Sequence, residues 1–160
     1  MPGLPQLAFL LSIVGLSVSL AGFSGLVAAF KRGVPLRPVD AYRLRQIPEM
    51  ALAAGFIALI TLALADTVGN ASIAIRVAAV AGLLFTGAHI FVLARRARAM
   101  NMRLTGTNVV VAGVIDIAVI IAAVVSVIVG SAAAYEWLLA LMIARPGLAF
   151  LLALTDVTVA

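Results

Sequence analysis

The sequence predicts an all-α protein, a single domain that spans a membrane as a bundle of five helices. Hydrophobic types make up 65% of the 160 residues and charged types only 11%, against roughly 45–50% and about 25% in soluble domains. Only helices and closed barrels satisfy the backbone inside lipid, and the long apolar runs lack the alternation of barrel strands. This composition excludes a water-soluble enzyme, a DNA-binding domain and a disordered tail.

The five expected spans follow from the uncharged stretches, because a helix needs about 20 mainly apolar residues to cross the hydrocarbon core. In chain order we predict them at Leu7–Phe30, Ile47–Ala65, Ser72–Ala94, Val109–Gly130 and Trp137–Val157. No lysine or arginine precedes the first span, so we expect a permanent helix rather than a cleaved signal peptide.

The segment before the second span has its own local signals. Pro35 and Pro38 predict an extended stretch over Gly33–Val39, because proline disfavours helix in the residue before it. Asp40 then has the side chain to cap a short helix over Ala41–Gln46. We expect this short helix to lie at the membrane interface as a lead-in to the span, with a dedicated lipid-recognition element as the alternative.

The sequence of the last span is compatible with two structures. Pro146 follows Arg145 directly and removes one helical hydrogen bond, and Gly147 adds flexibility. We favour a kinked full span with a cytoplasmic C-terminus, because an arginine at a hairpin tip would still need burial or water. The alternative is four spans plus a re-entrant hairpin, in which Trp137–Ala144 enters and Leu148–Val157 returns to the outer side.

The basic residues predict the orientation. Most of the 11 lysines and arginines lie in the loops Lys31–Gln46 and Arg95–Arg103, and short basic loops remain in the cytoplasm. We therefore expect a bacterial inner-membrane protein with its N-terminus outside and with outer loops at Asp66–Ala71 and Ser131–Glu136. We interpret the net charge of +5 as contact with anionic lipids rather than nucleic acid. The expected lipid-facing basic residues are Arg43, Arg45, Arg95, Arg96 and Arg98.

Small residues recur at helical spacing in two spans. In the first span one row is Ser17, Ala21, Gly25 and Ala29, and an adjoining row is Gly15, Ser19 and Gly22; in the third the row is Ala74, Ala78, Gly82 and Thr86. Such rows allow helices to approach closely in lipid. We expect packing within the bundle, with a homo-oligomer as the alternative because the first span carries two rows.

Ionisable residues at membrane depth are the candidate functional residues, because such groups are costly in lipid and usually face protein or water. Asp116 and Arg145 lie at comparable depth in consecutive spans, and a buried charge without a partner is unfavourable, so we predict that they pair. His89 extends the row of the third span and is expected to join them by a hydrogen bond. Glu49 is expected to reach the headgroups or pair with Arg45. The cluster of His89, Asp116 and Arg145 fits a packing latch or a proton or ion relay.

The sequence offers little for catalysis. The chain has no cysteine and one histidine, which leaves no thiolate site and no multi-histidine metal site. Phosphate-binding glycine loops and the common hydrolase motifs are missing as well. We therefore expect no enzymatic activity, no metal and no cofactor.

Three segments carry a resemblance. The first span contains Ser19-Leu20-Ala21-Gly22-Phe23 followed by Gly25, the next loop contains Arg43-Leu44-Arg45, and Glu49 opens the second span. These segments resemble a group of small, uncharacterised bacterial multi-span membrane proteins that share such a first helix, loop and glutamate. Trp137–Leu141 together with Phe150–Leu152 resembles their final helix. The resemblance implies a multi-span fold and no particular activity.

The function expected from these observations is that of a structural or accessory subunit that associates with other helices through its rows of small residues. A small oligomeric channel or transporter lined by His89, Asp116 and Arg145 is the alternative. A path through the protein would require oligomerisation, since five helices rarely enclose one alone.

Overall fold

The fold is described from a computed structural model, which describes residues 5–30, 38–99 and 107–155. Nearly all of these residues are helical, and no strand occurs in these ranges. The helices are α1 (Leu7–Phe30), α2 (Pro38–Val68), α3 (Ala71–Ala99), α4 (Thr107–Val129) and α5 (Ala132–Thr155). Each contains a segment long and apolar enough to cross a membrane. The predicted all-α bundle with five spans is therefore confirmed.

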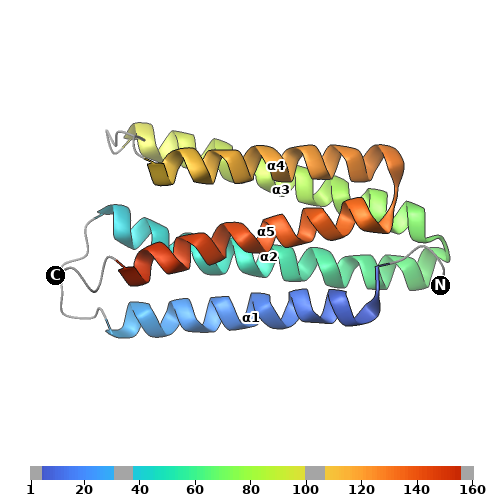
Figure 1. The fold of residues 1–160 in the computed structure, drawn as a ribbon, viewed down its shortest axis with the longest axis horizontal. Coiled ribbons are helices and arrows are strands. Elements are labelled where there is room, and N and C mark those ends of the chain that lie inside the picture. The colour runs from blue at the N-terminus through green and yellow to red at the C-terminus, as the bar shows by residue number, and fades with distance from the viewer. Residues whose placement is uncertain (1–4, 31–37, 100–106, 156–160) are drawn as a thin grey trace.

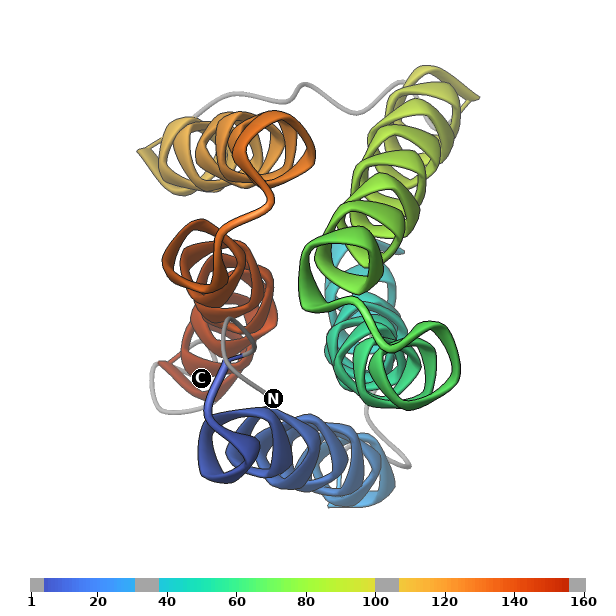
Figure 2. The same ribbon diagram turned by 90° about the vertical axis from the view of Figure 1, so that its right-hand side faces the viewer.

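The helices run up and down in alternating directions (Figure 1). Seen from the end, α2 and α3 lie on one side, α4 and α5 lie on the other, and α1 lies below α2 and α5 (Figure 2). The structure has contacts between α2 and each of α1, α3 and α5, and α4 packs on α3 and α5. The central contact between α2 and α5 joins the two sides of the bundle.

The two ends of the bundle differ in character. One end, which we call the basic end, carries Arg45 near the start of α2 and Arg95, Arg96 and Arg98 at the end of α3 (Figure 1). At the opposite end, which we call the turn end, α2 connects to α3 and α4 connects to α5. The described arginines of the two predicted loops therefore lie at one end of the bundle, whereas Lys31, Arg32, Arg37 and Arg103 lie outside the described residues.

Two predicted details of the segment before the second span are wrong. Pro38 and Val39 are helical rather than extended, and the predicted short helix Ala41–Gln46 is continuous with the second span, because α2 runs through Pro48; the rest of the predicted extended stretch Gly33–Val39 lies outside the described residues. The favoured full last span is confirmed, because α5 runs through Arg145 and Pro146 without a break, which excludes the alternative re-entrant hairpin. One lost hydrogen bond is tolerated in both helices because their neighbours hold them in place.

The connections at the turn end are shorter than predicted. Gly69 and Gly130 follow α2 and α4 with φ of 65° and 67°, a left-handed conformation that ends helices and favours glycine. Asn70 then accepts a hydrogen bond from the Ile73 backbone N–H at 3.1 Å, and Ser131 accepts one from Ala134 at 3.3 Å. Because of these caps, α3 and α5 begin at Ala71 and Ala132. Most residues of the expected outer loops, Asp66–Ala71 and Ser131–Glu136, are therefore helical.

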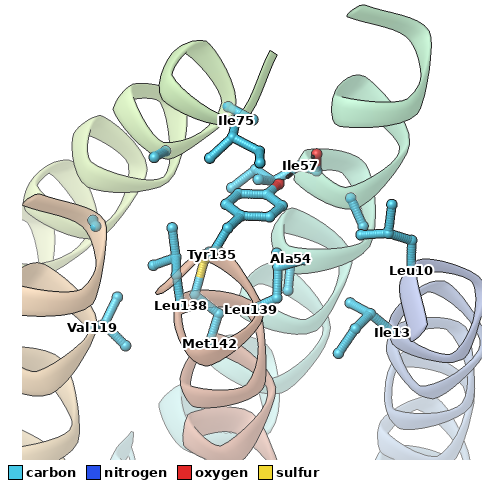
Figure 3. Packing of buried hydrophobic residues seen from close by; sticks show 14 residues of the cluster. Leu10, Ile13, Ala54, Ile57, Ile75, Val119, Tyr135, Leu138, Leu139 and Met142 are labelled. Carbon is cyan, nitrogen blue, oxygen red and sulfur yellow. Dashed lines mark hydrogen bonds between the residues drawn. The ribbon is translucent and has the colours of Figure 1, made fainter. Parts of the chain in front are cut away.

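The core lies between the two sides of the bundle and is made mainly of Leu, Ile and Ala. Figure 3 shows Tyr135 of α5 pointing toward Ile57 and Ile75, above Leu138 on the same helix. The remaining members of this cluster are Leu10, Ile13, Ala54, Ala58, Ala78, Ala79, Val119, Ala123, Leu139 and Met142. Every helix contributes to this cluster, so the five spans form one packed unit.

The predicted rows of small residues are used differently in α3 and α1. In α3 the row is buried, and Gly82 lies against Leu138 and Met142 of α5. In α1 only Ser17 of the first row is buried, and the adjoining row faces outward without a neighbouring helix. Packing within the bundle is therefore confirmed for the row in α3 and for Ser17, but not for the rest of α1.

The close approach of α1 to α2 depends on Gly55. A Cβ atom at Gly55 would lie 2.9 Å from the Ser17 Cβ atom. We therefore expect Gly55→Leu to lower the free energy of unfolding by about 1–3 kcal/mol, because overpacking pushes the two helices apart. Denaturation of the protein in mixed micelles, followed by circular dichroism, measures the effect.

The matched control is Gly87→Leu on α3, because a Cβ atom at Gly87 has no neighbour within 4 Å. This variant is expected to unfold like the unmodified protein. Equal stability of the Gly55 and Gly87 variants would show that the Ser17–Gly55 contact does not limit the packing of α1.

The outer surface of the bundle is apolar. Large hydrophobic side chains are exposed on all five helices, among them Phe23 on α1, Phe56 on α2, Leu84 on α3, Ile128 on α4 and Trp137 on α5. A water-soluble protein rarely exposes apolar surface of this extent. This surface is suited to contact with lipid.

Candidate functional site

The candidate site begins with an ion pair between α4 and α5. The Arg145 Nε–H donates a hydrogen bond to Asp116 Oδ1 at 3.1 Å. Both residues are buried, with exposed fractions of 6% and 8%. The predicted pairing of Asp116 and Arg145 is therefore confirmed. The pair is stabilised by Coulomb attraction, and it relieves the cost of placing either charge alone in a low-dielectric interior.

His89 lies near this pair but bonds elsewhere. Its Nε2 is 3.3 Å from Nε2 of Gln46 on α2, and its ring stacks on Phe85 with 6.1 Å between ring centroids. The predicted hydrogen bond to Asp116 or Arg145 is wrong: among the described residues the side-chain partner of His89 is Gln46. The charges of both residues nevertheless act on the imidazole, as do those of Glu49 and Arg96.

The candidate site is a cluster of four residues, one from each of α2, α3, α4 and α5, in one layer of the bundle: Gln46, His89, Asp116 and Arg145. Asp116 lies about 14 Å along α4 from Thr107, and Arg145 and His89 lie about 15 Å from the ends of α5 and α3, at 1.5 Å per residue. All three distances are measured from the basic end. The cluster therefore lies within the candidate membrane spans, in the half of the bundle nearer the basic end.

The basic end itself is exposed. The Arg45 Nε–H donates to Glu49 Oε1 at 2.7 Å, and their side chains are 66% and 40% exposed, which confirms the expected pair. Arg95 and Arg98 are exposed and Arg96 is partly buried, while the side chain of Arg43 lies outside the described part of the chain. The expected contact of these side chains with lipid headgroups stays a prediction.

A second polar contact lies nearer the turn end, and sequence reasoning missed it. The Tyr135 hydroxyl bonds to the Thr61 hydroxyl and donates to the Ile57 carbonyl oxygen at 3.2 Å. Both side chains are fully buried. Uncharged polar residues are common in membrane helices, so neither residue stood out. Gln46 was missed for the same reason, although its neighbour Ile47 opened a predicted span.

An apolar layer separates the two polar contacts. Leu138, Leu139 and Met142 lie on α5 between Tyr135 and Arg145, and they are buried against Ala54, Ile57 and Gly82. Within the described residues no cluster of His, Cys, Asp or Glu is suited to hold a metal ion. The arrangement therefore offers ion pairing, hydrogen bonding and proton exchange at the Asp116–Arg145 layer, and tight packing beyond it.

Five apolar helices long enough to cross a membrane, with a buried ion pair between α4 and α5, are the features of a multi-pass helical membrane protein. Comparison of the chain with models of known protein families, with curated proteins and with solved structures gives no match. The resemblance of the first span to small bacterial membrane proteins therefore stays an expectation.

Proposed function

We propose that this protein is a structural or accessory subunit of the bacterial inner membrane that associates with a partner helix through the outward face of α1, and that it has no catalytic role. The observation that carries the proposal is the composition of that face. Exposed positions spaced alternately by four and three residues are occupied by Ala8, Ser12, Gly15, Ser19, Gly22, Leu26 and Ala29.

This spacing supports helix association. Positions that alternate by three and four residues form one seam along a helix, the geometry of left-handed packing. Small residues in the seam allow backbones to approach, which drives association where lipid supplies no hydrophobic force. Cβ atoms at Gly15 and Gly22 would meet nothing within 4 Å. The seam therefore has room for another helix.

The interior of the bundle also favours a structural role. In the described part of the chain, no buried side-chain nitrogen or oxygen lacks a hydrogen-bond partner. Buried polar groups that are satisfied within the chain stabilise one arrangement of helices. We further propose that the N-terminus lies outside and that the basic end faces the cytoplasm and its anionic lipids, in accordance with the positive-inside rule.

The test is self-association, with a second copy of the chain as the simplest partner. We expect Gly15→Leu and Gly22→Leu to lower the dimer fraction, measured by Förster transfer between labelled copies in lipid vesicles, while circular dichroism stays unchanged. Gly87→Leu, on the outward face of α3, is the matched control. A monomer at all protein-to-lipid ratios would reject self-association, and unchanged transfer in both α1 variants would reject the seam.

A second candidate function, a small oligomeric channel or transporter, is favoured by the layer formed by Gln46, His89, Asp116 and Arg145. Intramembrane ionisable groups that face the bundle interior are typical of ion and proton pathways. The test is the flux of protons, with and without small anions, into vesicles that contain the purified protein. Flux that Asp116→Asn abolishes would support the candidate, and no flux above that of empty vesicles would reject it.

A further inference from the structure

The Arg145–Asp116 pair has unused binding capacity. A guanidinium group carries five N–H donors, and within the described residues Arg145 uses one of them, at Nε. No completely buried side-chain nitrogen in these ranges is without a hydrogen-bond partner. Since the terminal amino groups of Arg145 have no such partner there, they must retain some exposed surface. The side chains of Arg145 and Asp116 retain exposed fractions of 8% and 11%.

Space beside the pair lies on the face of α4 that carries Asp116. Gly113 precedes Asp116 by three residues, so the two lie on one face of the helix, one turn apart. A Cβ atom at Gly113 would meet nothing within 4 Å. Gly113 is on the side of Asp116 nearer the basic end. Open space beside Gly113 therefore lies one helical turn from the pair, in the direction of the basic end.

Electrostatics restricts what can bind there. Arginine stays protonated in proteins, so any change that neutralises Asp116 would leave a positive charge alone in the interior, which is strongly unfavourable. An added anion beside the intact pair would equally leave a net negative charge. The site remains neutral only when a proton and an anion bind together.

The charged and titratable groups around the pair are consistent with this requirement. His89 on α3 shares the layer of the pair, and Arg96 lies nearer the end of α3. The charges of Arg145, Asp116, Glu49 and Arg96 all act on the His89 imidazole. Glu49 is already paired with Arg45. The exposed arginines of the basic end raise the local concentration of anions at that end, because charges of one sign attract counter-ions.

We propose that Arg145 binds a small carboxylate or oxyanion together with one proton: the anion replaces Asp116 on the guanidinium, and Asp116 takes up the proton. Before binding, the site holds the Arg145 cation and the Asp116 carboxylate. After binding, it holds the same cation, the anion and a neutral carboxylic acid. The charge of the site is unchanged, and the proton comes from the solution at the basic end. The inference deepens the second candidate function but requires only binding.

The experiment uses the full chain in nanodiscs of zwitterionic phosphatidylcholine, in weakly buffered solution with a pH indicator. Sodium formate and sodium nitrate are the probes, because neither buffers near neutral pH, and sodium chloride is the reference salt. We expect formate or nitrate to cause proton uptake above the chloride level. Calorimetric titration of the same samples should give equal numbers of anions and protons bound.

Four variants locate the site. Arg145→Gln should abolish binding and proton uptake, and Gly113→Leu should weaken both by filling the open space one turn from Asp116. Asp116→Asn should bind the anion without proton uptake. Gly87→Leu, with its outward side chain on α3, should behave like the unmodified protein. Circular dichroism verifies that each variant is folded.

Several results would overturn the inference. These are, in the unmodified protein, proton uptake no greater than with chloride or anion binding without protons, and, in Arg145→Gln, full anion binding. Loss of formate and nitrate binding when phosphatidylglycerol is added would overturn it in favour of a lipid headgroup site. Binding without transport in sealed vesicles would reject only the transport function, and transport without anion binding would reject only this inference.

Discussion

Asp116→Asn and Arg145→Gln are each expected to lower the free energy of unfolding by about 3–5 kcal/mol, the cost of leaving one partner of a buried ion pair uncompensated. The expectation rests on the 3.1 Å contact between Arg145 and Asp116 and on their burial. Unfolding in mixed micelles, followed by circular dichroism, gives the values. Glu49→Gln, which breaks the exposed pair with Arg45, is the matched control and should cost less than about 1 kcal/mol.

The double variant Asp116→Leu/Arg145→Met separates the cost of an unpaired charge from the value of the pair. Replacing a buried ion pair by apolar residues of similar volume is often neutral or stabilising. We therefore expect the double variant to be more stable than either single variant. Additive losses in the double variant would show that the two side chains act independently, in contradiction to the pairing.

A stable double variant also bears on function. Apolar residues are the usual occupants of membrane helices. If leucine and methionine stabilise the fold as well as the ion pair does, the pair is not needed for stability, and its charged groups have another use. Asp116→Leu/Arg145→Met should then retain the fold and lose the anion-dependent proton uptake. The same pair of substitutions thus tests packing and binding separately.

The spans and the ion pair were predictable because charge is rare in this chain. Asp116 and Arg145 interrupt long apolar runs, and the cost of an isolated charge in lipid is large enough to dictate a partner. The positions of the helix ends were less predictable. Asn70 and Ser131 cap α3 and α5 immediately after a glycine, so local capping rather than hydropathy determines where these helices begin.

The partners of neutral polar residues were not predictable for a different reason. The His89–Gln46 contact and the Tyr135–Thr61 contact depend on how each helix is rotated about its axis. Hydropathy is nearly uniform around α1, α2 and α3, so their sequences carry little information on rotation. For the same reason the rows of small residues in α1 and α3 looked equivalent, although one faces outward and the other is buried.

Tyr135→Ala is expected to lower the free energy of unfolding by about 3–5 kcal/mol, as for other large aromatic side chains removed from a core. Tyr135 is fully buried and joins α5 to Ile57 of α2 and Ile75 of α3 (Figure 3). In lipid the loss comes mainly from dispersion contacts and the cavity, since helix association there has no hydrophobic driving force. The same unfolding measurement in mixed micelles applies.

Tyr135→Phe isolates the hydroxyl group, which bonds to Thr61 and to the Ile57 carbonyl oxygen. Its removal should cost about 0.6–1.7 kcal/mol, the range for hydrogen bonds between membrane helices. Thr61→Val should cost a similar amount, and the double variant should cost less than the sum, because the two hydroxyl groups share one bond. If Tyr135→Ala costs no more than Tyr135→Phe, the ring does not hold α5 against α2 and α3, and other contacts between the two sides of the bundle, among them those of Leu138 and those between α3 and α4, hold them together.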